Sequence, residues 1–377
     1  MKGIYSLHED ANINFQLNRC IAWGGEETID DLKDAAHRIH DFEDWKRELL
    51  LLAERAVANN KYLLAAYYYR AAEFFMSTSD PDKLKTYNRF IELMSIQFPK
   101  YQTARELVPY EGGYLPAWRL RPITRALGTI VLHGGFDSFI EELFPQLDNI
   151  LVRGFELIIF EGPGQGAALI RYGLPMTHEW EKPLDALLNY FGVEDVSLIG
   201  MSLGGYLALR AAAYDSRVKR VVAFDALYDF YDCLMAKLGP RQRMLTLLLS
   251  LKADRLIDIA METVASRNLL VKWGISQGMH TTGSRRPSEY LRKLHAYSAK
   301  KISSLVHQDV LIMGGSADHF LKMDQFYNQV EALTATRSLT ARLFTEAEGA
   351  QSHCQIGNFP LAIDTMLRWI EERSGLE

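Results

Sequence analysis

Residues 198–213 read LIGMSLGGYLALRAAA: a short apolar run, a serine between glycines, and an alanine-rich segment. The apolar run predicts a buried strand and the alanine-rich segment predicts a helix, so Ser202 stands at the turn between them. Two explanations fit the glycines. Either they let the strand and the helix pack closely, or they leave room for a sharp turn that presents Ser202 as a nucleophile. Residues 200–204, GMSLG, match the G-x-S-x-G nucleophile elbow.

The chain around this elbow alternates strands with helices. Two short runs at 104–112 and 114–122 flank Gly113 and predict an antiparallel hairpin. Further strands are expected at 128–135, 155–162, 195–200, 218–225, 309–315 and 340–346. The middle runs are continuously apolar, which is typical of a parallel sheet buried on both faces. We therefore predict an α/β fold with a mostly parallel, eight-stranded sheet.

Two helical regions accompany the predicted sheet. Apolar residues recur at steps of three and four from Phe42 to Ala56, which indicates an amphipathic helix within an N-terminal helical accessory domain, 1–104. A tetratricopeptide-like, partner-binding repeat is the alternative, but no second copy follows at a fixed period. More than 80 residues with helical pattern separate Asp225 from Asp309. This interval predicts a helical cap insertion.

The predicted units follow from these two regions. The cap insertion is expected at 227–307, and it divides the α/β core into a first part, 105–226, and a second part, 308–377. The cap should lie over the carboxyl ends of the strands, where open α/β sheets bind their ligands.

Composition limits the class of partner. The net charge is -5 and the pI about 6.1, which argues against a nucleic-acid or anionic-membrane surface. Three widely spaced cysteines without a C-x-x-C pair argue against a disulfide framework and a zinc site. The opening residues have no apolar stretch of signal-peptide length, so we expect a reduced, cytoplasmic protein.

No cofactor or metal is expected. The glycine-rich segment EGPGQG at 161–166 lacks the Gly-Lys-Ser/Thr ending of a phosphate-binding loop, so a tight turn is the better interpretation. The sequence also contains no His-Glu-x-x-His motif and no cluster of cysteine and histidine.

A nucleophilic serine needs a base that is held by an acid, and this fold places them in the chain order serine, acid, histidine. Asp318 follows the strand at 309–315, and His353 lies in the loop after the strand at 340–346. Asp318 could instead cap the following helix, and Asp225 is the rival acid. Cys354, beside the predicted base, is either a packing residue or a reactive thiol.

Other histidines fit the role of base less well. His133 precedes the glycines of the predicted oxyanion loop, and His319 directly follows Asp318. The remaining competitors lie in or beside the helical regions: His37, His40, His280, His295 and His307. The alternative for His353 itself is an ordinary surface or helix-capping histidine.

An acyl-transfer site also needs two backbone N–H groups that bind the oxyanion of the tetrahedral intermediate. One is expected from Leu203, directly after the nucleophile. The other is expected from the loop HGGFDS at 133–138, at Phe136 or Gly135.

Five segments in this order resemble the α/β-hydrolase superfamily: GTIVLHGGFDSFIEEL, FEGPGQG, GMSLGGYLALRAAA, GGSADHF and EGAQSHC. They are most similar to the group that contains 2,6-dihydroxypseudooxynicotine hydrolase and the fermentation–respiration switch proteins, whose bacterial relatives are often labelled acylaminoacyl peptidases. The resemblance covers most of the chain. It implies a triad of Ser202, Asp318 and His353, an active site between core, cap and N-terminal helices, and a homodimer.

The predicted function is a serine hydrolase that acts on a small ester or on a carbon–carbon bond of an activated ketone. Asp225, Tyr206 and Tyr228 are the predicted substrate-pocket residues. The aromatic residues Phe136, Tyr206, Tyr228 and Trp273 line an apolar pocket or, as large apolar residues, are simply core. The resemblance also implies an additional carboxylate for carbon–carbon cleavage, for which Asp225 and Asp229 are candidates. The alternatives are an amidase on short or acylated peptides and a noncatalytic partner-binding protein.

Overall fold

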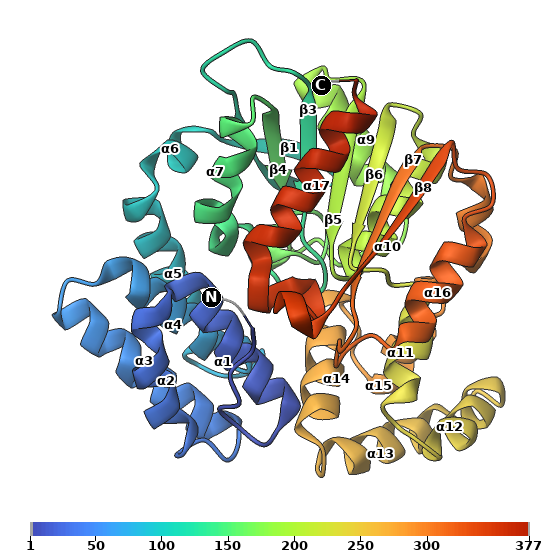
Figure 1. Cartoon of the computed structure of the whole chain (residues 1–377). Coiled ribbons are helices and arrows are strands. Elements are labelled where there is room, and N and C mark those ends of the chain that lie inside the picture. The colour runs from blue at the N-terminus through green and yellow to red at the C-terminus, as the bar shows by residue number, and fades with distance from the viewer. Residues whose placement is uncertain (1–2, 376–377) are drawn as a thin grey trace.

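A computed structural model describes residues 3–375 and contains one eight-stranded sheet in the order β1-β2-β4-β3-β5-β6-β7-β8 (Figure 1). Strand β2 runs antiparallel to both β1 and β4, and every other neighbouring pair is parallel. The predicted α/β fold with an antiparallel start is confirmed. The strands are β1 Arg105–Tyr110, β2 Gly113–Leu120, β3 Thr129–His133, β4 Glu156–Phe160, β5 Val196–Met201, β6 Val218–Phe224, β7 Asp309–Gly315 and β8 Ser338–Phe344.

The central strands are apolar because helices cover both faces of the sheet. All residues of β4, β5 and β7 are buried. Figure 1 shows α7 and α17 across the near face, with α9 and α10 behind the strands. The helices of the core are α7 Phe144–Val152, α8 Gly166–Ile170, α9 Glu181–Phe191, α10 Leu203–Tyr214, α16 Met323–Ala332 and α17 Phe359–Arg373.

Six α-helices precede the sheet in the described part of the chain. They are α1 Ala11–Gly24, α2 Ile29–Ala36, α3 Phe42–Ala58, α4 Tyr62–Phe74, α5 Lys83–Gln97 and α6 Pro99–Thr103. The stripe predicted from Phe42 onward is the buried face of α3, on which Trp45 and Leu49 are fully buried. The buried residues of these helices belong to the same apolar core as the sheet, so they pack on the main body.

The segment between β6 and β7 contains five α-helices: α11 Phe230–Ala236, α12 Arg241–Ser250, α13 Asp254–Ala265, α14 Leu269–Thr281 and α15 Pro287–Leu294. They surround a small apolar core of their own, which includes Met235, Leu245 and Tyr290. This cap also contacts the N-terminal helices, because Trp273 of α14 stacks on Phe74 of α4 with ring centroids 5.2 Å apart. No helix within residues 3–375 is long and apolar enough to cross a membrane.

Candidate active site

Ser202 occupies a sharp turn between β5 and α10. Its backbone has φ 58° and ψ −123°, a conformation that strains a residue with a side chain. A Cβ on Gly200 would lie 1.9 Å from the Gly204 carbonyl oxygen, and one on Gly204 would lie 2.5 Å from the Gly134 oxygen. The close packing at these glycines is what allows the turn at Ser202 to be so sharp.

A chain of two hydrogen bonds joins Ser202, His353 and Asp318. His353 Nε2 lies 2.8 Å from Ser202 Oγ, and His353 Nδ1 lies 2.6 Å from Asp318 Oδ2. The serine comes from the β5–α10 turn, the aspartate from the loop after β7, and the histidine from the segment after β8. The three predicted residues meet at the carboxyl edge of the sheet, in the order that proton transfer to a base requires.

Asp318 also organises its own loop. Its Oδ1 accepts hydrogen bonds from the backbone N–H groups of Phe320, at 2.7 Å, and Leu321, at 3.0 Å. Helix α16 begins only at Met323, so the carboxylate closes a turn and does not cap the helix. One oxygen thus holds the loop while the other faces His353.

Asp225, the rival acid, lies on the other side of the same ring nitrogen. Its Oδ2 is 3.1 Å from His353 Nδ1 and accepts the Cys354 backbone N–H at 2.6 Å. Its Oδ1 accepts from Gln355 Nε2 at 2.9 Å. Cys354 and Gln355 both have positive φ values, near 47°. Asp225 therefore anchors the irregular segment that carries the histidine.

These contacts set the protonation of the site. Burial opposes a charge on His353, but the neighbouring carboxylates Asp318 and Asp225 outweigh it and hold its pKa well above the ordinary 6.5. Burial raises the pKa of the Cys354 thiol to about 11, so this thiol stays protonated and is a packing residue.

Asp225, His353 and Cys354 also present three possible ligand atoms within 4.8 Å of one another. Both ring nitrogens of His353 are already hydrogen-bonded, Nε2 to Ser202 and Nδ1 to Asp318. A metal ion at this cluster would have to break one of those bonds, so the arrangement fits a triad better than a metal centre.

The loop after β3 approaches the elbow closely. A Cβ on Gly135 would lie 2.5 Å from the Met201 oxygen and 2.9 Å from the Leu203 nitrogen. The Gly135 N–H donates to Ser138 Oγ at 3.2 Å. Within residues 3–375, the N–H groups of Phe136 and Leu203 have no protein acceptor. Of the predicted pair Phe136 and Gly135, only Phe136 therefore has a free N–H for an oxyanion.

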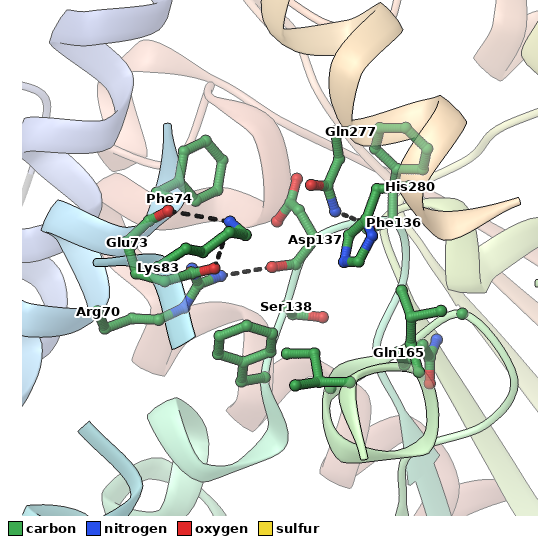
Figure 2. A pocket seen from close by; sticks show the side chains of 15 residues that line it. Arg70, Glu73, Phe74, Lys83, Phe136, Asp137, Ser138, Gln165, Gln277 and His280 are labelled. Carbon is green, nitrogen blue, oxygen red and sulfur yellow. Dashed lines mark hydrogen bonds and ion pairs between the residues drawn. The ribbon is translucent and has the colours of Figure 1, made fainter. Parts of the chain in front are cut away.

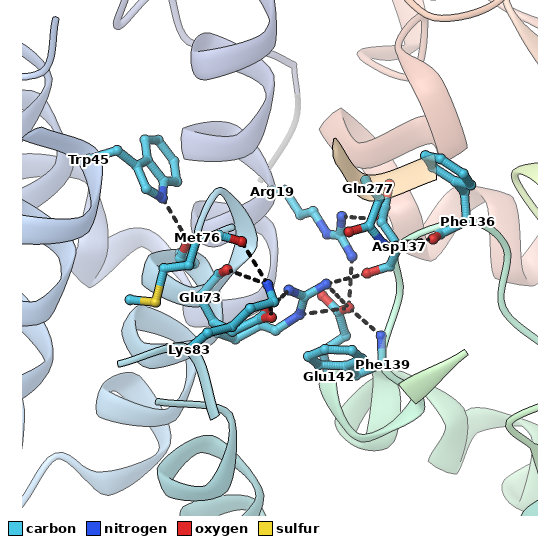
Figure 3. Close-up of polar contacts among 12 residues, drawn as sticks. Arg19, Trp45, Glu73, Met76, Lys83, Phe136, Asp137, Phe139, Glu142 and Gln277 are labelled. Carbon is cyan, nitrogen blue, oxygen red and sulfur yellow. Dashed lines mark hydrogen bonds and ion pairs between the residues drawn. The ribbon is translucent and has the colours of Figure 1, made fainter. Parts of the chain in front are cut away.

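Side chains of the N-terminal helices and of the cap contact the loop after β3 (Figure 3). Arg19 of α1 pairs with Asp137 at 3.0 Å and with the buried Glu142 at 2.7 Å. Arg70 of α4 donates to the Asp137 carbonyl oxygen and also pairs with Glu142. From the cap, Gln277 Nε2 donates to the Phe136 carbonyl oxygen at 3.1 Å. These contacts have no local signal in the sequence, since Arg19 and Glu142 are 123 residues apart.

Ser202 opens into an apolar cleft under the cap. The cleft encloses about 700 Å³, including its solvent-open mouth. Phe136, Asp137, Leu203 and His353 of the core line it, together with residues of the cap and of the loop after β7: Leu227, Phe230, Cys233, Leu234, Lys237, Leu270, Val271, Trp273, Gly274, Tyr290, Phe320 and Leu321.

A second cavity of about 460 Å³ also reaches Ser202, and Phe15, Arg19 and Trp23 of α1 line it. Ser202 therefore lines both the cap-side cleft and this α1-side cavity. A third, polar pocket encloses about 400 Å³, and Figure 2 shows its lining side chains. In this pocket Arg70, Lys83 and Asp137 pair with their neighbours.

The predicted pocket residues Asp225, Tyr206 and Tyr228 lie outside the linings of both cavities beside Ser202. The Tyr206 hydroxyl donates to the Ala296 carbonyl oxygen at 3.0 Å, so this residue fastens α10 to the cap. Asp225 lies behind His353, and the backbone N–H of Tyr228 donates to Gln325. Of the aromatic residues considered from the sequence, Phe136 and Trp273 do line the cleft, and both are largely buried.

The family model described as "alpha/beta hydrolase fold" matches residues 130–347. The chain belongs to the α/β-hydrolase fold family. It is 30% identical to the α/β hydrolase ucsC of Acremonium sp. over 76% of this chain and 68% of that one. It is 26% identical to the 20-hydroxy-prefusarin hydrolase FUS2 of Gibberella moniliformis, over 86% of this chain and 83% of that one.

Solved structures agree on the fold. The 2,6-dihydroxy-pseudo-oxynicotine hydrolase superposes with a TM-score of 0.64 at 20% identity, covering 93% of this chain and 94% of that one. AbyA5 superposes with a TM-score of 0.70 at 17% identity, covering 96% and 94%. The superfamily expected from the five sequence segments is confirmed, and the likeness extends over the N-terminal helices and the cap.

Proposed function

We propose that this hydrolase is a serine hydrolase with Ser202 as nucleophile, His353 as general base and Asp318 as the acid that orients the histidine. The observation that carries the proposal is the pair of hydrogen bonds from Ser202 Oγ through His353 to Asp318. A noncatalytic scaffold has no need to keep all three groups in hydrogen-bond contact at a strained turn, which disfavours the partner-binding alternative.

In the proposed reaction Ser202 Oγ attacks a carbonyl carbon while His353 Nε2 takes the hydroxyl proton. The negative charge on the carbonyl oxygen is bound by the free N–H groups of Phe136 and Leu203. His353 then protonates the leaving group, which is an alkoxide for an ester or a carbanion for an activated ketone. Water releases the acyl group from Ser202 by the same steps. The elevated pKa of His353 favours the imidazolium that forms when Ser202, and later water, gives up its proton.

The substrate class follows from the cleft. Its lining is mainly apolar, with Asp137 and Lys237 as its two charged members beside Ser202 and His353, so we propose a small, largely apolar ester or activated ketone with its acyl side under the cap. The relative named as a 20-hydroxy-prefusarin hydrolase supports an organic small molecule as substrate. An amidase on free peptides ranks lower, because both cations beside Ser202 already have partners. Arg19 of the α1-side cavity is paired with Asp137 and Glu142, and Lys237 of the cap-side cleft donates to the His319 carbonyl oxygen.

A panel of p-nitrophenyl esters, p-nitroanilides and β-diketones tests this proposal, with Ser202→Ala and His353→Ala as catalytic variants. We expect turnover of short-chain and medium-chain esters or of β-diketones, a loss of about 10³-fold or more in both variants, and little anilide hydrolysis. Full activity in folded Ser202→Ala protein would refute the proposal. The expected homodimer remains a prediction that sedimentation equilibrium can check.

A further inference from the structure

The glycine-rich segment 161–166, which the sequence explains only as a tight turn, reaches the candidate oxyanion loop through one side chain. Gln165 is 3% exposed and stands at the start of α8. Its Nε2 donates to the carbonyl oxygens of Gly134, at 2.7 Å, and Gly135, at 3.1 Å. Its Oε1 accepts the Gly162 N–H at 3.0 Å. Figure 2 shows Gln165 together with the loop residues Phe136 and Ser138.

These contacts define the orientation of the amide group. Gly162 N–H can only donate, and the two carbonyl oxygens can only accept, so the oxygen and nitrogen of Gln165 have one consistent placement. All three of its hydrogen-bonding contacts go to backbone groups. Gln165 therefore links the β4–α8 turn to the loop after β3.

The Gly135 carbonyl and the Phe136 N–H belong to the same peptide unit. This unit is planar and trans, so its C=O and N–H point in opposite directions and rotate together. A side chain that fixes the Gly135 oxygen therefore also fixes the direction of the Phe136 N–H.

The preceding peptide unit is held at both ends. The Gly134 oxygen accepts from Gln165 and lies 2.9 Å from His133 Nδ1, and the Gly135 N–H donates to Ser138. His133 is buried and neutral, since burial lowers its pKa to about 4. Its Nε2 accepts from Trp180 Nε1 at 3.1 Å, so the ring carries its proton on Nδ1 and donates to Gly134.

We infer that Gln165 is a positioning residue of the oxyanion hole: it holds the Gly135–Phe136 peptide so that its N–H points at the site of the reacting carbonyl. Every other polar group of the two peptides has a partner within the described chain, and the Phe136 N–H alone is left free. Gln165 does not touch the substrate. This inference rests on the proposed function.

The test measures the second-order rate at which an alkyl fluorophosphonate phosphonylates the enzyme, because this reaction needs the same oxyanion contacts whatever the natural substrate. Gln165→Met removes the amide and keeps much of the volume. Gln165→Glu keeps the shape and serves if the methionine variant does not fold. Gln308→Met is the matched control, because Gln308 Nε2 donates to the Ala212 carbonyl oxygen at 2.6 Å, away from the site.

We expect phosphonylation to slow about 10- to 100-fold in the folded Gln165 variants, less than the ~10²- to 10³-fold loss when a donor is removed outright. The control should react like wild type. The pH midpoint of the reaction should not move, because His353 is untouched. A boronic acid, which forms a tetrahedral adduct, should bind the variants at least tenfold more weakly, whereas the matching carboxylic acid should bind equally well.

Wild-type reaction rates and boronic acid affinity in a folded Gln165 variant would overturn the inference. An equal loss of affinity for the boronic and the carboxylic acid would also overturn it, because that result indicates a general disturbance of the cleft. Failure of the proposed function is a separate result: the wild-type protein would then not be phosphonylated at Ser202 at all.

Discussion

His353 Nδ1 lies between two carboxylates, 2.6 Å from Asp318 Oδ2 and 3.1 Å from Asp225 Oδ2. In serine proteases, replacing the single triad aspartate by asparagine lowers kcat about 10⁴-fold, because the histidine adopts the wrong tautomer. Here the second carboxylate still accepts the Nδ1 proton. We therefore expect Asp318→Asn to lower kcat by only about 10²-fold, and Asp318→Asn with Asp225→Asn to lose about 10⁴-fold. Steady-state kinetics on the folded variants measures both losses. A kcat for Asp318→Asn as low as that of the double variant would contradict this account.

Asp318 and Asp225 also govern how the activity and the stability depend on pH. They hold the pKa of His353 well above 6.5, and the base must be neutral to accept the serine proton. The acid limb of the kcat/KM profile should therefore have its midpoint above pH 6.5, and Asp225→Asn should move it to lower pH. The charged histidine stabilises the fold fully below about pH 6.5, and this contribution is lost as the pH rises through the folded-state pKa. An acid limb that stays in place in Asp225→Asn would contradict this assignment.

The backbone of Ser202 is strained because the residue occupies a sharp turn. Ser202→Gly should raise the free energy of unfolding by about 1 kcal/mol while abolishing activity, because glycine adopts φ 58° without strain. Ser202→Ala should abolish activity with little gain in stability. Urea denaturation compares the two variants, and equal stability would show that the turn stores no strain.

Gly274 offers a way to narrow the cleft without damaging the fold. A Cβ there would contact only Leu234 Cδ1, at 3.8 Å, and leucine is about 0.8–1 kcal/mol better than glycine inside a helix. Gly274→Leu should therefore keep or raise stability and lower kcat/KM about tenfold or more for long acyl chains, with little effect on acetate. Gly278→Leu is the contrast, since its Cβ would lie 2.0 Å from the Tyr290 ring and should destabilise the cap. Equal loss on all chain lengths would argue against the acyl side lying under the cap.

Arg19 connects the N-terminal helices to the loop after β3. Arg19→Ala leaves Asp137 without this partner and leaves the buried Glu142 with Arg70 alone. Breaking a buried pair in this way should lower the free energy of unfolding by about 2–4 kcal/mol and slow phosphonylation of Ser202. Urea denaturation and labelling kinetics measure both effects. Unchanged labelling in a destabilised variant would mean that the contacts of Arg19 with Asp137 and Glu142 stabilise the fold but do not affect the reactivity of Ser202.

The sequence predicts the parts of this protein that have local signals. Strand ends, the G-x-S-x-G turn and the chain order of serine, acid and histidine are sufficient to propose Ser202, Asp318 and His353, because parallel strands bring their carboxyl ends to one edge. The partners of the Gly135–Phe136 peptide have no such signal. Gln165 contacts a residue about 30 positions away in the sequence, and Arg19 contacts one more than 100 positions away. Neither separation matches the period of a helix or a strand, so no sequence pattern reveals these contacts. Tyr206 and Tyr228 were predicted for the pocket from residue type alone, which does not determine the face on which a side chain lies.

The most direct test of the central claim is to map a fluorophosphonate adduct by mass spectrometry in the wild type, Ser202→Ala and His353→Ala. The account predicts one adduct per chain, on Ser202, absent in the first variant and formed at least 10³-fold more slowly in the second. An adduct on another residue, or none on the folded wild-type protein, would contradict the proposal that Ser202 is an activated nucleophile.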